Sequence, residues 1–367
     1  MASTAHAATL PAAGSNIAAV LYGKNDLRIE HRQIPDVTES DVLIRVAYTG
    51  ICGTDAHLLT YAQLGRDLIL DGPMVLGHEA SGTVIEVGSK VESLKPGDRV
   101  AMDNVISCLK CYMCKKGRQN LCKHRSYAGM PNIDGSLQYI ALHPAGSCYK
   151  LPNNVSLEEG ALIEPLSIGI FACDRGEVSA GSKVLVCGAG TIGLVTAMSA
   201  IAMGASRVCV TDVSPERLTA ARRIVNSVET VLVGGSDEND ESKIYEALCG
   251  RPDISIECSG AYSSLLLSIQ VTDAGGTVIL VGFGEEGKIS VPIHDIIRRE
   301  ISIRSIFGRN CKIYPMAIEA VNSGKINLKG LITHRRDLRQ IHEAIDIAKT
   351  GRDGAIKVMI NVEKLQN

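Results

Sequence analysis

The sequence predicts an α/β protein with two domains, one rich in β-strands and one built on a doubly wound parallel sheet. Three observations lead to this prediction. The chain has 367 residues, which exceeds the roughly 250–300 residues at which a single hydrophobic core stops growing. Short β-type runs broken by glycine and proline fill its first part. Farther along, apolar strands alternate with helical stretches, a pattern typical of a parallel sheet.

The first domain is predicted over residues 1–165. Within it, Val42–Val46 and Gly82–Val87 alternate between apolar and polar residues, as half-buried strands do. A Lys-Pro-Gly-Asp turn signal precedes the short run Arg99–Ala101. The leader, residues 1–16, is rich in Ala, Ser and Thr, and we expect it to be disordered before the first strand.

The second domain is predicted over residues 166–306. The apolar run Lys183–Cys187 is followed by a glycine-rich turn and a long helix, and Ser214-Pro215 is a helix start signal. The other strands predicted in this domain are Arg207–Asp212, Ile254–Cys258, Thr277–Val281 and Ile301–Arg304.

The last zone, residues 307–367, combines two helical stretches, Tyr314–Asn322 and Leu338–Lys349, with a closing strand, Ala355–Ile360. From the pattern alone, this zone either extends the parallel sheet or returns to the first domain.

Composition excludes several classes of function. The net charge is −2, which gives no electrostatic basis for binding nucleic acid or anionic lipid. No apolar run approaches the roughly 20 residues that a membrane helix needs. Twelve cysteines without a secretory signal indicate a reducing compartment, so we expect a cytoplasmic protein.

A dinucleotide site is predicted at the turn Gly188-Ala-Gly-Thr-Ile-Gly193. Gly188 permits the tight turn, Gly190 lets the backbone approach a pyrophosphate, and Gly193 lets the helix pack closely on the strand. Asp212 ends the next strand, where a carboxylate binds the ribose hydroxyls of NAD and repels the extra phosphate of NADP. A helix-capping role is the alternative for Asp212, and Arg217 could tolerate a phosphate; we predict a preference for NAD.

Four cysteines, Cys108, Cys111, Cys114 and Cys122, follow one another at the spacing C-x2-C-x2-C-x7-C. Four thiolates this close can surround one zinc ion tetrahedrally. Because all four positions are protein ligands, this zinc would be structural.

A second set of metal-binding residue types is dispersed along the chain: Cys52, His78, Glu79 and Glu164. Each residue alone has an ordinary structural interpretation, such as a small buried thiol, a hydrogen-bonded core histidine or an acid in the first turn of a helix. Their spacing alone does not decide between these interpretations and a metal site.

At these residues the chain resembles the zinc-containing medium-chain dehydrogenases, and within them the sorbitol (polyol) dehydrogenases. The resemblance runs from about Ala18 to Ile360. The segments GICGTDAH, GHEASG, EPLS, GAGTIG and LITHR and the cysteine cluster occur in family order. The resemblance implies a GroES-like catalytic domain that is interrupted by a Rossmann domain, with the end of the chain returning to the first domain. It also implies an active site in the cleft between the two domains.

The resemblance also assigns roles to residues. It implies that Cys52, His78 and Glu79 bind a catalytic zinc, with Glu164 as a further ligand or as a hydrogen-bond partner of water or substrate, and with Asp55 orienting His78. Thr54 and His57 match the proton relay of the family. The residues expected along the cofactor channel are Ile192, Val281, Gly282, Phe283, Phe307 and Arg309.

The resemblance is weakest among the predicted substrate contacts, Glu164, Arg309 and Asn310. The family has a tyrosine where this chain has Asn310, and many members have another where it has Leu58. Arg309 matches the family, so we expect a hydroxylated substrate. The leading hypothesis is NAD-linked oxidation of a sorbitol- or xylitol-like polyol at one secondary alcohol, an L-iditol 2-dehydrogenase activity.

Two alternatives remain open at this point. One is a threonine or 2,3-butanediol dehydrogenase on the same scaffold, which the absence of two tyrosine hydroxyls favours. The other is a non-catalytic NADH-binding or structural protein. The resemblance further implies a homodimer or homotetramer.

Overall fold

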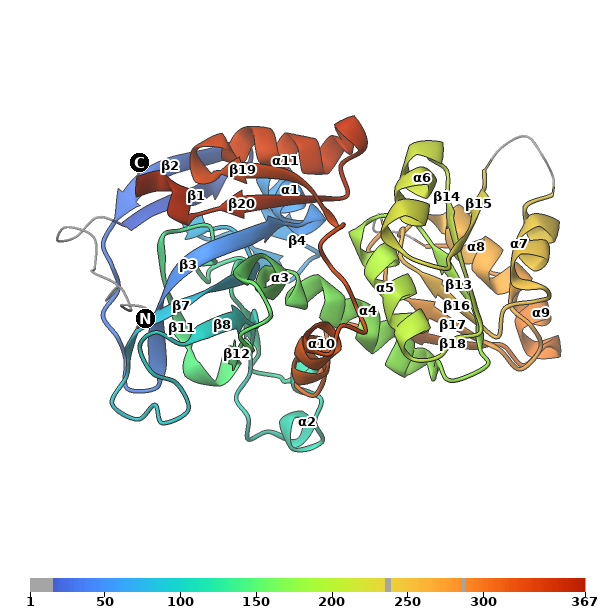
Figure 1. The fold of residues 1–367 in the computed structure, drawn as a ribbon, viewed down its shortest axis with the longest axis horizontal. Coiled ribbons are helices and arrows are strands. Elements are labelled where there is room, and N and C mark those ends of the chain that lie inside the picture. Colours follow the sequence, from blue (N-terminus) through green and yellow to red (C-terminus); the bar gives the residue numbers. More distant parts are fainter. Residues whose placement is uncertain (1–15, 235–238, 285–287, 367) are drawn as a thin grey trace, which may run out of the picture. The chain divides into compact units, whose positions relative to one another are not determined.

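The computed structural model describes residues 16–234, 239–284 and 288–366 of the chain (Figure 1). They form two compact units. One contains residues 16–108, 124–164 and 334–366, and the other contains residues 109–123 and the described part of 165–333. The predicted leader lies outside the described residues except for Asn16, which is fully buried and opens the first strand.

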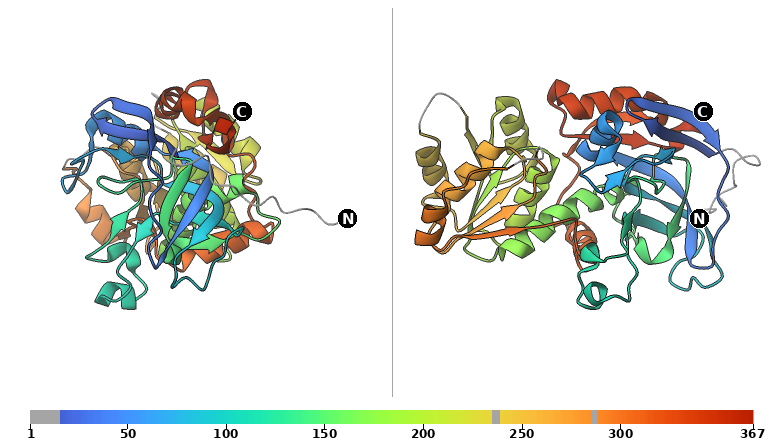
Figure 2. Two further views of the ribbon diagram at one scale, coloured as in Figure 1. Left: turned by 90° about the vertical axis from the view of Figure 1, so that its left-hand side faces the viewer. Right: turned by 180° about the vertical axis from the view of Figure 1, so that it is seen from behind.

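The first unit is built on a mixed β architecture around one hydrophobic core (Figures 1 and 2). The order of the main sheet in the described residues is β12 (Cys148–Lys150), β8 (Arg99–Met102), β7 (Glu79–Val87), β3 (Asp41–Ile51), β20 (Lys357–Asn361) and β19 (Ile332–Asp337), and β11 (Ile140–Pro144) also pairs with β3. A smaller sheet consists of β2 (Asp26–Arg32), β1 (Asn16–Gly23) and β6 (Met74–Val75). The helices α1 (Gly53–Tyr61), α3 (Leu157–Ala161) and α11 (Ile341–Thr350) pack on these strands.

The long strand β3 positions most of the residues discussed below. It pairs antiparallel with β7, so that Gly50 lies opposite Glu79, and with β20, so that Gly50 also lies opposite Met359. The closing strand of the chain therefore joins the sheet of the first unit, as the family resemblance implies.

The second unit contains a parallel sheet in the order β15 (Glu229–Leu232), β14 (Arg207–Asp212), β13 (Lys183–Cys187), β16 (Ile254–Glu257), β17 (Thr277–Leu280) and β18 (Ser302–Ser305). Helices cover both faces of this sheet, with α5 (Thr191–Ala202) and α6 (Pro215–Ile224) on one side and α7 (Asp240–Leu248) and α8 (Tyr262–Val271) on the other (Figure 1). The order confirms the predicted doubly wound α/β fold.

The remaining elements are short or lie beside these sheets. The remaining strands described are β4 (Gln63–Leu64), β5 (Leu68–Ile69), β9 (Val105–Ile106) and β10 (Ser126–Tyr127). The remaining helices described are α2 (Tyr112–Lys115), α4 (Ile163–Gly176), α9 (Ile293–Arg298) and α10 (Ile313–Asn322). In the part of the chain that the structure describes, no helix is long and apolar enough to cross a bilayer.

Candidate active site and cofactor site

Three of the four dispersed residues that can bind metal lie close together in the first unit. One ligand atom each from Cys52, His78 and Glu79 lies within 4.8 Å of the other two. Cys52 directly precedes α1, His78 directly precedes β7, and Glu79 is the first residue of β7. A thiolate, an imidazole and a carboxylate are the donor types that zinc accepts, so this group fits a zinc ion. Glu164 is buried in the first turn of α4 but is not a member of the group.

Asp55 connects the two segments that carry these donors. One carboxylate oxygen, Oδ2, accepts a hydrogen bond from the backbone N of Cys52 at 2.8 Å, and Oδ1 accepts one from the backbone N of Gly77 at 3.2 Å. Oδ1 also lies 3.6 Å from Nδ1 of His78. Burial alone would lower the pKa of His78, but the negative charges of Asp55 and Cys52 outweigh it and raise this pKa well above its ordinary value. The site therefore stabilises positive charge, as a metal site must.

Thr54 and His57, the predicted relay residues, both lie on α1. Sγ of Cys52 is 3.7 Å from Oγ1 of Thr54, so this hydroxyl lies beside the donor group. The imidazole of His57 is exposed and packs against the ring of Tyr61, with 4.6 Å between the ring centroids. One end of the predicted relay is thus near the donors and the other is in contact with solvent.

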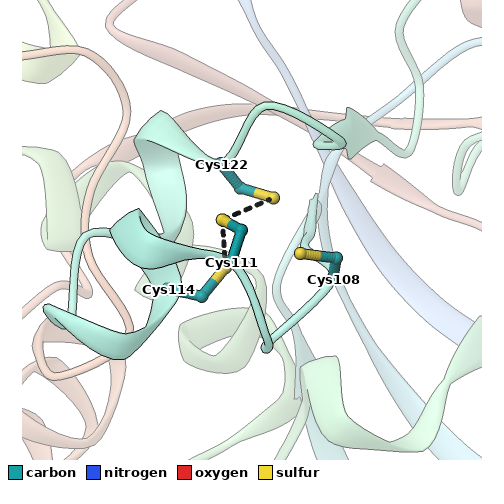
Figure 3. Close-up of side chains that lie close together, drawn as sticks. All are labelled: Cys108, Cys111, Cys114 and Cys122. Carbon is teal, nitrogen blue, oxygen red and sulfur yellow. Dashed lines mark hydrogen bonds between the residues drawn. The ribbon is translucent and has the colours of Figure 1, made fainter.

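The cysteine cluster also converges (Figure 3). All four sulfurs lie within 4.8 Å of one another, and Sγ of Cys111 is 3.6 Å from that of Cys114 and 3.8 Å from that of Cys122. Four sulfurs at about 2.3 Å from one tetrahedral zinc ion would be roughly 3.8 Å apart. None of the four is in a disulfide. The cluster therefore has the chemistry and the spacing of a structural zinc site.

In the second unit, the glycine-rich turn has the three features that a dinucleotide turn requires. Gly188 has a φ of +107°, which favours glycine. A Cβ on Gly190 would have no atom within 4 Å, so the space above this residue is open. A Cβ on Gly193 would overlap the carbonyl oxygen of Gly188, because α5 packs closely on the turn. The N-terminus of α5 then faces the open space, as needed for a pyrophosphate.

Comparisons with known proteins show the family of the chain. Residues 38–153 match the alcohol dehydrogenase GroES-like domain and residues 191–323 match the zinc-binding dehydrogenase domain. Sorbitol dehydrogenase of Mus musculus is 45% identical over 354 residues, covering 96% of this chain and 98% of the relative. That of Homo sapiens is 44% identical, covering 95% and 96%. The chain belongs to the zinc-containing medium-chain dehydrogenases.

Solved structures of other dehydrogenases have a similar fold over nearly the whole chain. The structure of 2R,3R-butanediol dehydrogenase from Bacillus subtilis has a TM-score of 0.85 and 27% identity, covering 95% of this chain and 100% of that one. The medium-chain dehydrogenase described here is therefore an oxidoreductase of the sorbitol dehydrogenase type that uses zinc and NAD, which confirms the predicted enzyme class and cofactors.

Asp212 of this dehydrogenase is buried at the end of β14, beside the glycine-rich turn. Its Oδ2 accepts a hydrogen bond from the backbone N of Ala189 at 2.7 Å, and its Oδ1 accepts one from that of Ser214 at 2.9 Å. The carboxylate therefore already fixes the turn. Each of its oxygens can accept further bonds, so these contacts leave capacity for ribose hydroxyls. Arg217 is half-buried in the first turn of α6.

The other predicted cofactor residues lie in the second unit. Phe283 is 81% exposed, and its ring is in edge contact with that of Phe307, with 6.4 Å between the centroids. The half-buried residues among them are Ile192, Val281, Gly282 and Phe307. The guanidinium of Arg309 is buried and stacks over the ring of Tyr314 at 4.7 Å.

Asn310 has a local structural role in the dehydrogenase. Its Oδ1 accepts a hydrogen bond from the backbone N of Lys312 at 3.1 Å, just before α10. The amide oxygen that could contact a substrate is therefore engaged with the backbone.

Lys357 is a residue that sequence reasoning missed. This residue of β20 is buried, and its Nζ lies 2.8 Å from Oε1 and 2.6 Å from Oε2 of Glu79. The sequence does contain a sign that Lys357 has a charged partner, because it is the one charged residue in the otherwise apolar run Ala355–Ile360. A charged side chain at a core-facing strand position needs a partner of opposite charge.

Proposed function

We propose that the enzyme oxidises one secondary alcohol of a sorbitol- or xylitol-like polyol to a ketone, with NAD as the hydride acceptor. The convergence of Cys52, His78 and Glu79 carries this proposal, because it combines three zinc-binding donor types at one place in the first unit. The proposal is further supported by relatives of high coverage that bear the name sorbitol dehydrogenase.

In this proposal, Cys52, His78 and Glu79 hold the catalytic zinc and the four clustered cysteines hold the structural one. When bound, zinc would supply Lewis acidity toward the alcohol oxygen, and NAD would supply the hydride acceptor. Three protein ligands leave a position for the substrate, whereas four thiolates leave none. Asp55 keeps the segments of Cys52 and His78 in register through its hydrogen bonds to their backbones.

The alcohol proton is passed through Thr54 to His57. The Thr54 hydroxyl lies beside the sulfur of Cys52, and the exposed imidazole of His57 releases the proton to solvent. The buried carboxylate of Glu164 accepts a hydrogen bond from a substrate hydroxyl. On the cofactor side, Gly188, Gly190 and Gly193 receive the pyrophosphate, and Asp212 binds the ribose.

A second candidate is oxidation of a shorter diol or of an amino alcohol, such as 2,3-butanediol or threonine. Two observations favour it. Leu58 is fully buried and offers no hydroxyl, and the side-chain oxygen of Asn310 accepts a hydrogen bond from the backbone N of Lys312. A site with fewer hydrogen-bonding groups discriminates less strongly for a long polyol.

Initial rates of the zinc-loaded protein with NAD over sorbitol, xylitol, 2,3-butanediol and threonine decide between these candidates. Fast turnover of the polyols supports the first. Inert polyols with a reactive diol or threonine move the substrate to the second. If all four substrates are inert while zinc and NAD are bound, both substrate proposals are wrong.

We also propose a homodimer or homotetramer and a cytoplasmic location. β18 is an edge strand of the parallel sheet, and Ile303 on it is 40% exposed, so this strand can pair with a second copy. None of the cysteines is in a disulfide, in accord with a reducing compartment. Light scattering after size exclusion tests the oligomer, and a monomer would contradict it.

A further inference from the structure

Lys357 and Glu79 form an ion pair inside the first unit. Their side chains are only 3% and 1% exposed. The ammonium of Lys357 contacts three acceptors, the two carboxylate oxygens of Glu79 and the carbonyl oxygen of Ile51 at 3.0 Å. An ammonium group has three protons, so it can donate to all three of these acceptors at once.

The sheet brings this pair together across one intervening strand. Gly50 on β3 lies opposite Glu79 on one side and opposite Met359 on the other. Because side chains alternate along a strand, Lys357 shares the face of Met359 and therefore that of Glu79. Gly50 has no side chain, and a Cβ there would overlap Oε2 of Glu79. Because Gly50 has no side chain, the space between the strands is open for the contact of the Glu79 carboxylate with the Lys357 ammonium.

The same carboxylate belongs to the group of zinc donors. A zinc ion and the Lys357 ammonium are both cations that bind its oxygens, so they compete for its negative charge. With Cys52 as thiolate and Glu79 as carboxylate, the two charges of zinc would be balanced, so the ammonium of Lys357 is a further positive charge that acts on the carboxylate that zinc would share. At a desolvated site such a charge acts with little screening.

We propose that Lys357 is a positioning residue of the zinc site: it holds the Glu79 carboxylate in place, withdraws part of its charge from the zinc, and so weakens zinc binding while keeping the ion electrophilic. This proposal rests on the proposed function only for the position of the zinc. It makes no assumption about the substrate.

The test measures metal affinity without substrate. Cobalt(II), whose absorption reports thiolate coordination, and zinc in competition with a chelator are titrated into the metal-free catalytic site at one fixed pH. We expect Lys357→Met to bind metal at least about tenfold more tightly, the smallest effect typical of close charge pairs at desolvated sites. In the Glu79→Gln background the same substitution has little effect, because the shared carboxylate is gone.

A matched control is Lys150→Met. Lys150 also pairs with a carboxylate of the first unit, that of Asp98 at 2.9 Å, but its side chain is 52% exposed. We expect no change in metal affinity for this variant. If Lys357→Met does not fold, Lys357→Gln, which can still donate to Glu79 but has no charge, takes its place in the titration.

Two results would overturn the proposal. Weaker metal binding in the Lys357 variant would show that the ammonium supports the zinc site and does not compete with it. An equally large gain in affinity with and without Glu79 would show a general charge effect. Failure of the polyol assay affects neither measurement, so the substrate proposal and this one fail separately.

Discussion

Gly50 and Glu79 face each other on neighbouring strands, and the carboxylate of Glu79 occupies the space that a side chain on Gly50 would fill. The conformation of Gly50 does not require glycine, since its φ is not positive. Its role is therefore steric. It leaves room for one of the three predicted zinc ligands.

Gly50→Ala should displace the Glu79 carboxylate and disrupt the catalytic zinc site. We expect the variant to lose about one zinc ion per chain and most of its activity while the cysteine cluster keeps its zinc. Elemental analysis together with initial rates measures both effects. Gly146→Ala is the control, because a Cβ at Gly146 meets nothing within 4 Å. Full zinc content and activity in Gly50→Ala would contradict the assignment of Glu79.

Cys122 should be required for the structural zinc, since its sulfur is buried within the cluster. Binding of a structural metal contributes directly to folding free energy. We expect Cys122→Ser to lose about one zinc per chain and to make residues 109–123 sensitive to trypsin, which cleaves after lysines such as Lys115 and Lys116. Cys249→Ser replaces an exposed cysteine and serves as the control. Equal protease resistance of the two variants would argue against a zinc in the cluster.

Five of the six strands described in the parallel sheet could be predicted closely, because local sequence specifies them; the edge strand β15 was not predicted. Lys183–Cys187 and Arg207–Asp212 are observed with the predicted bounds. Both contain a continuous apolar run, and a turn follows each strand. In the first unit, the predicted Val42–Val46 lies in the first half of an eleven-residue strand, Asp41–Ile51. The added residues include glycine, tyrosine and threonine, and pairing with β7 and β20 keeps them extended.

The candidate site could be predicted as a set of residues but not as an arrangement. The zinc donors were found through motifs. The partner of Glu79 was not, because Lys357 is 278 residues away and reaches it only through the register of β20 on β3. Likewise, the contact of the side-chain oxygen of Asn310 with the backbone N of Lys312 is visible only in the structure, because it depends on the side-chain and backbone conformation at these residues. Long-range register is a tertiary property that no local pattern specifies.

Asp212 should set the preference for NAD. Its carboxylate is held beside the glycine-rich turn by Ala189 and Ser214, where it would face the ribose. We expect Asp212→Asn to lower the ratio of kcat/KM for NAD to that for NADP by about tenfold or more, because the charge that repels a phosphate is lost. Steady-state rates with both cofactors measure this.

A matched control for this prediction is Asp253→Asn. Asp253 also accepts a backbone hydrogen bond next to β13, from Lys183 at 2.8 Å, but at the opposite end of the strand. We expect its cofactor ratio to stay at the wild-type value. An unchanged ratio in Asp212→Asn would refute the ribose assignment.

His143 should make stability depend on pH. The ring is buried, and its Nε2 donates to the carbonyl oxygen of Asp103 at 2.9 Å. Burial lowers the pKa of His143 below its ordinary value of 6.5, although the contacts with Asp103 oppose this. As the pH falls through 6.5, the unfolded chain takes up a proton that the folded state does not. The free energy of unfolding must then decrease as the pH falls toward the folded pKa, by at most about 1.4 kcal/mol per pH unit.

His143→Gln removes this titration but keeps a donor for Asp103, so the variant should lose less stability than the wild type between about pH 7 and pH 5. Urea unfolding of the zinc-loaded proteins measures the difference, and zinc loss at low pH affects both equally. His342→Gln, on the exposed side of α11, is the control and should retain the wild-type dependence. If the His143 variant and the wild type lose stability in parallel, the buried imidazole is not the group responsible.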